Sequence, residues 1–223
     1  MEKQMSFTEM EYNQRQRTTK REVFLNEMNR LIPWEECVSM IAPYYPSGNR
    51  GRPPREIEQM LRMLLLQTWF NLSDEGVEDA IYDSYAMKTF MGVDFASGEQ
   101  VPDATTLCKF RKLMTVNGLQ KKFFAIVQGL LERYITDNIK RNYRINRQRG
   151  TFKRHYGDSL AWEYEKKLEN RKSSVRCKVE YMFHIVKDVF HWRKARYKGI
   201  AKNDAFAHLA FASANIYLLA AMG

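Results

Sequence analysis

The sequence feature that most constrains the fold is the recurrence of apolar residues three or four positions apart. Between Glu56 and Phe70 the apolar residues would all lie on one face of an α-helix, which is the pattern of a helix with one buried face. The same period covers residues 22–32, 35–41, 102–114, 118–134 and 205–221. The sequence therefore predicts a mainly α fold built from several short helices.

Polar residues at the start of two runs are typical of helix caps. Ser73, followed by two acidic residues, predicts the N-cap of a helix with Val77, Ile81 and Tyr85 on its apolar face. Asp103 predicts a second cap, because its carboxylate can accept hydrogen bonds from the first free backbone N–H groups of the next helix. Short helices joined by tight turns are compatible with a helix-turn-helix DNA reader and equally with a plain helical bundle.

Residues 173–190 form a further helical pattern that carries charges beside its apolar stripe. The stripe consists of Val175, Val179, Met182, Phe183, Val186 and Phe190. At 100° per residue, Arg176, Glu180 and Lys187 fall within a band about 40° wide at its edge. Two interpretations stay open: an amphipathic helix with an i,i+4 ion pair, or a site that holds one carboxylate between two cations.

The net charge of +10 is concentrated in the second half of the chain. Residues 1–133 carry 17 Lys and Arg against 18 Asp and Glu, whereas residues 134–223 carry 19 against 8. Such asymmetry favours a polyanionic partner, most simply nucleic acid, because each neutralised phosphate releases a counterion.

The cysteines and the apolar runs predict a cytoplasmic protein. Cys37, Cys108 and Cys177 are odd in number and far apart, which argues against a disulfide framework or a zinc site. The first residues lack the apolar segment of a secretion signal. The apolar run 205–221 is interrupted by polar residues and is short for a membrane span, so we expect a buried terminal helix and no membrane partner.

The spacing of Arg176, Glu180 and Lys187 resembles the C-terminal signature of bacterial insertion-sequence transposases with a DDE catalytic triad. Residues 194–203 are similar to the run that follows this signature in the insertion-sequence-five group. Residues 66–74 and 101–107 resemble the N-terminal domain of the same group, and these two runs are longer and more specific. The family often has a Tyr three residues before the Arg, where this chain has a Ser.

The resemblance implies a helical DNA-binding domain over residues 1–133, with a linker near 44–55, followed by a ribonuclease-H-like α/β domain. Tyr134 to Val175 is only 42 residues, and at about 5–6 residues per strand this length cannot hold a five-stranded sheet. Residues 137–147 resemble the late part of the family core. We therefore predict an internal deletion, with its junction near 133–137, and a truncated remnant with few or no strands over residues 134–223.

The same comparison implies that the metal site is incomplete. In the intact family three acids bind Mg²⁺, and Glu180 corresponds to the last of them, with Arg176 and Lys187 holding DNA phosphate. Asp103 lies in an Asp-Ala-Thr tripeptide like the one around the first catalytic Asp, but it opens a helix, so we assign it as a cap and not as a catalytic acid. The remaining local acids are Asp137, Asp158, Glu163, Glu165 and Glu169. We expect that they do not replace the two missing Asp residues and that Mg²⁺ is not bound stably.

Three basic groups are candidates for DNA contact. Arg50 and Arg52 lie in an Arg-Gly-Arg-Pro run that resembles an AT-hook, although a plain extended linker explains it as well. The other two groups are Lys109, Arg111 and Lys112, expected to face outward from the last N-terminal helices, and Lys194, Arg196 and Lys198.

These patterns predict a transposase-type protein that binds the ends of an insertion sequence on double-stranded DNA without cleaving it. A non-enzymatic repressor, or a dominant-negative partner of a full-length transposase, is the alternative, and a non-functional remnant is the third. We expect further partners to be a second copy of the chain or a full-length transposase.

Overall fold

The computed structural model describes residues 17–48, 53–136, 167 and 180–222. Throughout these ranges the protein is mainly helical and contains no strand, so the predicted mainly α class is confirmed. In chain order the elements are α2 (Lys20–Leu31), α3 (Trp34–Ile41), η1 (Ala42–Tyr44), α4 (Ile57–Trp69), α5 (Asp74–Asp83), α6 (Tyr85–Met91), η2 (Phe95–Ser97), α7 (Ala104–Val116), α8 (Leu119–Thr136), η3 (Ile185–Val189) and α11 (Ile200–Met222). The predictions on Arg50, Arg52, Arg176 and the acids of residues 137–169 lie outside the described residues.

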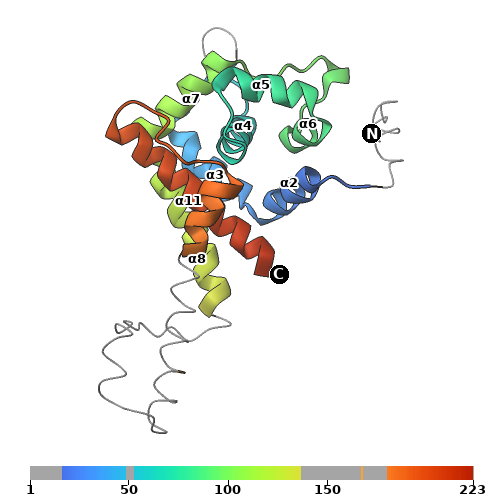
Figure 1. Cartoon of the computed structure of the whole chain (residues 1–223). Helices are drawn as coiled ribbons and strands as arrows, with labels where there is room; N and C mark the ends of the chain where they lie inside the picture. Colours follow the sequence, from blue (N-terminus) through green and yellow to red (C-terminus); the bar gives the residue numbers. More distant parts are fainter. Residues whose placement is uncertain (1–16, 49–52, 137–166, 168–179, 223) are drawn as a thin grey trace, which may run out of the picture.

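Helix α4 is the centre of the N-terminal part. It packs against α3, α5, α6, α7 and α11, which is why its burial extends beyond one stripe (Figure 1). Nine of its residues are buried, including Gln67, Thr68 and Trp69 near its end. The Thr68 hydroxyl donates to the Leu64 carbonyl at 2.9 Å, which satisfies this buried polar group within the helix.

The helix starts follow from local capping. Thr19 begins α2 with a capping box: its hydroxyl accepts from the Glu22 N–H at 3.2 Å, and the Glu22 carboxylate accepts from the Thr19 N–H at 3.4 Å. Ser73 caps α5 as expected, accepting from the Gly76 N–H at 2.9 Å. The same helix ends earlier than its pattern indicated, because Ser84 is extended, so Tyr85 belongs to α6.

The last helix, α11, lies in the core and not on its surface. It runs beside α8 and contacts α2, α4, α7 and η3 (Figure 1). Its buried positions include Ala210, Ala212, Ala214 and Ile216. Residues 200–221 are long and apolar enough to cross a bilayer, yet 56% of the most apolar window is buried inside the protein, as in a core helix of a soluble protein.

One hydrophobic core joins the two ends of the sequence. Phe24 of α2 packs its ring against Trp69 at 5.4 Å, Phe190 at 6.5 Å and Tyr217 at 5.9 Å between centroids. These rings come from α2, α4, the end of η3 and α11. Trp69 and Phe190 belong to a single cluster of buried residues, and the partly buried Phe24 and Tyr217 pack against it. The described part of residues 134–223 therefore shares its core with residues 17–133.

The helix predicted over 173–190 departs from regular geometry in its described part. Residues 180–184 are α-helical, and η3 then forms a π-helical turn whose wider i,i+5 spacing changes which side chains face inward. Ile185, Val186 and Phe190 are buried, whereas Phe183 is 48% exposed. The prediction that Phe183 belongs to the buried stripe is thus wrong, although its ring meets Phe211 edge-on at 5.5 Å.

The assignment of α11 to the core can be tested with two isoleucines of this helix. Ile216 is fully buried and Ile200 is 90% exposed. Ile216→Ala should lower the free energy of unfolding by about 2–5 kcal/mol because it leaves a cavity, and Ile200→Ala by less than about 0.5 kcal/mol. Urea denaturation followed by circular dichroism measures both. Equal effects would contradict the packing of α11.

Candidate nucleic-acid interface

Helix α7 carries the predicted basic group of Lys109, Arg111 and Lys112, and Asp103 caps its start. The Asp103 carboxylate accepts from the Thr106 N–H at 2.6 Å and from the Thr105 hydroxyl at 2.5 Å. These hydrogen bonds, with that from Thr105 largest, lower the pKa of Asp103 to about 2. The carboxylate is therefore engaged as a helix cap, and the prediction that Asp103 is a cap is confirmed.

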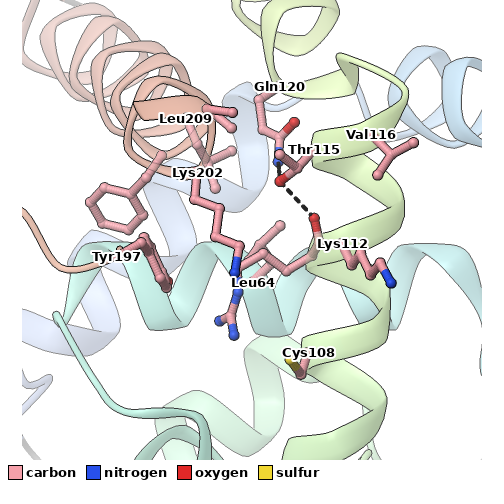
Figure 2. Close-up of a pocket in the computed structure, with 13 residues that line it drawn as sticks. Leu64, Cys108, Lys112, Thr115, Val116, Gln120, Tyr197, Lys202 and Leu209 are labelled. Carbon is pink, nitrogen blue, oxygen red and sulfur yellow. Dashed lines mark hydrogen bonds between the residues drawn. The ribbon is translucent and has the colours of Figure 1, made fainter. Parts of the chain in front are cut away.

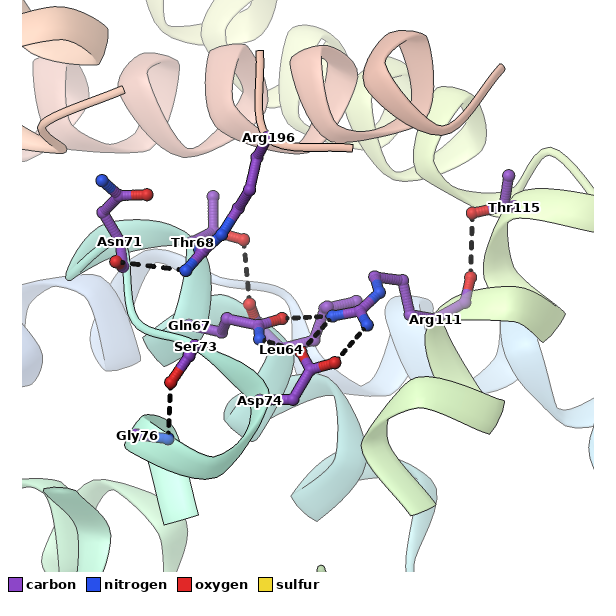
Figure 3. A network of polar contacts seen from close by, with 10 residues as sticks. All are labelled: Leu64, Gln67, Thr68, Asn71, Ser73, Asp74, Gly76, Arg111, Thr115 and Arg196. Carbon is purple, nitrogen blue, oxygen red and sulfur yellow. Dashed lines mark hydrogen bonds and ion pairs between the residues drawn. The ribbon is translucent and has the colours of Figure 1, made fainter. Parts of the chain in front are cut away.

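The basic residues of α7 separate into two kinds. Lys109 and Lys112 are exposed, as expected. Arg111 is turned inward, with 16% of its side chain exposed, so the expectation that it faces outward is wrong. Its guanidinium makes a bidentate pair with Asp74, at 2.6 Å from Nη1 to Oδ1 and 2.6 Å from Nη2 to Oδ2 (Figure 3).

The Asp74–Arg111 pair is the centre of a polar network that joins α4, α5 and α7. Gln67 of α4 donates to Asp74 at 2.5 Å and accepts from Arg111 at 2.9 Å, so its amide bridges both charges (Figure 3). The hydrogen bond from Arg111 holds the pKa of Asp74 below its ordinary value against the opposing effect of burial. The same bond raises the pKa of Arg111. Arg111 therefore has a structural role.

Arg196 also lies inward, at the turn between α4 and α5. Its Nη2 reaches the Asn71 carbonyl at 3.4 Å (Figure 3). The Asn71 side-chain amide in turn donates to the His191 carbonyl at 3.2 Å. Asn71 has a positive φ of 50°, a conformation that Asn tolerates better than most residues. These contacts tie the segment before α11 to the N-terminal helices. Lys194 and Lys198, on the same segment, are exposed.

One lysine of α7 and one of α11 line the same cavity. Lys109 and Lys112 are one turn apart on α7. Lys112 lines the cavity together with Lys202 of α11, which sequence reasoning did not select (Figure 2). Across the described part of the chain, neither Lys112 nor Lys202 is paired with a carboxylate. We call Lys109, Lys112 and Lys202 the lysine face.

The exposed surface of α5 has the opposite charge. Glu75, Asp79 and Asp83 are exposed there, and this helix has no basic residue. A polyanion is repelled from α5 and attracted to the lysine face, since unscreened charges act over about 8–10 Å at physiological salt. The exposed side chains of α5 and those of the lysine face are therefore of opposite charge.

The predicted catalytic residues do not form a metal site within the described ranges. Glu180 and Lys187 are exposed, and the Lys187 ammonium lies 5.8 Å from the centre of the Phe183 ring. The carboxylate of Asp188, the next acid along the chain, contacts His184 at 2.7 Å and Arg193 at 2.8 Å. No three His, Cys, Asp or Glu side chains gather there in a way that could hold a metal ion. The described residues thus do not fit the two-ion site of the resembled family.

One comparison with known proteins supports a transposase relationship. Residues 12–113 match the family model described as Transposase domain (DUF772). This range includes α2 to α6 and most of α7, and hence Asp74, Lys109, Arg111 and Lys112. No solved structure matches the chain. The finer relationship to the insertion-sequence-five group rests on the sequence resemblance alone.

The structural role of the Asp74–Arg111 pair predicts a loss of stability on its removal. Asp74→Ala should lower the free energy of unfolding by about 1–3 kcal/mol at pH 7, because the largely buried guanidinium loses its acceptor. Asp79→Ala, an exposed aspartate of the same helix, should change it by less than about 0.5 kcal/mol.

The difference in the free energy of unfolding between wild type and Asp74→Ala should depend on pH, because the pKa of Asp74 is lowered in the folded protein. The ionised Asp74 carboxylate contributes fully to stability above the pKa of an aspartate in the unfolded chain, about 3.9. This contribution is lost as the pH falls through the lower pKa that Asp74 has in the folded state. Urea denaturation from pH 7 to pH 3 should therefore show a constant difference between wild type and Asp74→Ala down to about pH 4 and a smaller one below. A difference that did not shrink would show that the charge of Asp74 is not its source.

Proposed function

We propose that this protein is a transposase-type DNA-binding protein that recognises double-stranded DNA at the ends of an insertion sequence. The observation that carries the proposal is the lysine face, on a scaffold whose residues 12–113 match a transposase domain. Phosphate contacts need positive charge and hydrogen-bond donors on the surface, and the three lysines supply both.

The arginines of the network serve this interface indirectly. The Arg111 guanidinium is occupied by Asp74 and Gln67, and it holds α7 against α4 and α5. This attachment fixes the orientation of α7, and with it the positions of Lys109 and Lys112, which lie at the surface of the same helix. The hydrogen bond from Arg196 to the Asn71 carbonyl likewise holds the segment before α11 in place, and this segment carries Lys194 and Lys198.

We further propose that the protein does not cleave DNA. Strand cleavage in the resembled family requires two Mg²⁺ ions, each held by carboxylates from separate elements. Glu180 is the acid that corresponds to the family signature, and a single carboxylate cannot hold two ions in fixed positions. A repressor or a dominant-negative partner of a full-length transposase, which is the alternative function, would also bind DNA without cleaving it.

Substitution of the lysine face should weaken DNA binding. The variant Lys109→Gln/Lys112→Gln/Lys202→Gln should bind at least about tenfold more weakly near 0.1 M salt and lower the slope of log K against log salt by about one for each lysine that contacts phosphate. Gel-shift titrations would use duplexes from the DNA that flanks the coding sequence and scrambled duplexes of equal composition. Arg111 is kept intact, because its loss would perturb the fold.

The matched control is Lys20→Gln/Arg30→Gln/Lys88→Gln, which removes the same charge from α2 and α6. It should retain the wild-type salt slope. Equal weakening by both variants would refute the lysine face as the interface, and absence of any shift with wild-type protein would refute DNA binding. A stronger shift with flanking than with scrambled DNA distinguishes end recognition from general attraction.

The lack of cleavage is tested with the same duplexes. Purified protein should leave labelled DNA intact in Mg²⁺ or Mn²⁺, because the described residues do not bring three metal-binding side chains together. Nicking that disappears in Glu180→Gln would contradict this prediction and show that acids elsewhere in the chain complete the site.

A further inference from the structure

The cavity beside the lysine face has the size and walls of a small-molecule site. Its volume is about 420 Å³, and it lies between α4, α7, α8, α11 and the segment before α11 (Figure 2). Ligand sites of proteins commonly have volumes of about 300–1,000 Å³ and mainly apolar walls. The apolar part of this wall consists of Leu64, Val116, Ala201, Ala205, Phe206 and Leu209.

Two polar atoms at this wall lack a partner among the described residues. Gln120 is 3% exposed; its amide nitrogen donates to the Thr115 hydroxyl at 3.2 Å, but its Oε1 accepts no hydrogen bond. The Tyr197 hydroxyl is likewise buried and unpaired. An unpaired buried polar atom costs about 1–3 kcal/mol, so the packing behind this wall is not fully satisfied.

Positive charge is placed at the opening and on one wall. Figure 2 shows Lys202 extending from α11 toward the space between the helices, while Lys112 lies on the outer side of α7. Arg111 also lines the cavity, with its guanidinium 5.0 Å from the centre of the Tyr197 ring. Since Asp74 already neutralises Arg111, the uncompensated charge is that of Lys202 and Lys112.

We propose that this cavity binds a small amphipathic anion, with an apolar body between α7 and α11 and one acidic group at Lys202. A neutral apolar ligand would leave the lysine charges unused, and a fully polar anion would leave the apolar wall exposed to water. The combination selects molecules such as aryl or alkyl carboxylates, sulfonates and phosphates.

Occupancy of the cavity would oppose DNA binding. This consequence rests on the proposed function, because Lys112 and Lys202 belong both to the cavity and to the lysine face. An anion seated at Lys202 neutralises charge that would otherwise contact phosphate, and by linkage DNA would lower the affinity for the anion by the same factor.

The site itself is tested without DNA, with 1-anilinonaphthalene-8-sulfonate and its uncharged analogue N-phenyl-1-naphthylamine. Fluorescence titration of the full chain should show one saturable sulfonate site, with the uncharged analogue at least about tenfold weaker. Lys202→Gln should weaken the sulfonate about five- to tenfold and leave the uncharged analogue unchanged. Because Lys202 is exposed, this variant does not threaten folding.

A second variant fills the cavity. Ala205→Phe should abolish binding of both probes, with thermal unfolding as the check that the variant is folded. Protection of Cys108, which lines the cavity and is exposed, gives an independent readout: the sulfonate should slow its alkylation by iodoacetamide, measured by peptide mass spectrometry. Equal affinity for both probes, or sulfonate binding unchanged in Lys202→Gln, would overturn the proposal.

The coupling is tested by repeating the DNA titration at saturating sulfonate. An increase of at least about fivefold in the Kd for DNA is expected. Sulfonate binding with unchanged DNA affinity would overturn the coupling and leave the site standing. Absence of DNA binding in every condition would refute the proposed function, while the probe titrations would still decide the site.

Discussion

The burial of α11 is the constraint on which the rest of the packing depends. This helix contacts α2, α4, α7, α8 and η3, so it covers apolar faces that come from both ends of the chain. Small side chains at Ala210, Ala212 and Ala214 let its neighbours approach closely. The buried Ser213 hydroxyl donates to the Leu209 carbonyl at 2.9 Å, so it adds no unsatisfied group to the core. Without α11 the apolar side of α8 would face water, and the N-terminal helices would lose a wall of their core.

Two arginines and three lysines of the candidate interface differ in placement in line with their chemistry. Arginine has a planar fork of donors that suits a fixed carboxylate or carbonyl, and Arg111 and Arg196 both point inward to such acceptors. Lysine carries a strongly hydrated point charge, and Lys109, Lys112 and Lys202 remain at the surface. These arginines thus stabilise the packing, while the three lysines leave positive charge at the surface. The inward arginines hold the elements that present the outward lysines.

Local signals in the sequence predicted most of the helices, because caps and apolar periodicity act over a few residues. Ser73 and Asp103 were identified as caps for this reason. Predictions that depended on distant partners or irregular turns were less successful. Helical periodicity alone places Arg111 on the outward side of its helix. It turns inward because it pairs with Asp74, which lies 37 residues earlier and is not apparent from the local sequence. Phe183 was assigned to the buried stripe at 100° per residue, whereas the π-helical turn at η3 changes that angle. Lys202 was missed because the cavity forms only when α7 and α11 meet.

The two activities of the resembled family make unequal demands on structure. Attraction of DNA depends on charge at the surface, so it tolerates changes elsewhere in the chain as long as the lysines are presented. Metal-dependent cleavage depends on several carboxylates held in fixed positions by separate elements. Asp103, whose tripeptide resembles that of the first catalytic Asp, is hydrogen-bonded to the start of α7. Asp188, the acid that follows Glu180 in the chain, contacts His184 and Arg193. The two demands can therefore be lost separately, which is why the function proposed for this chain keeps recognition without cleavage.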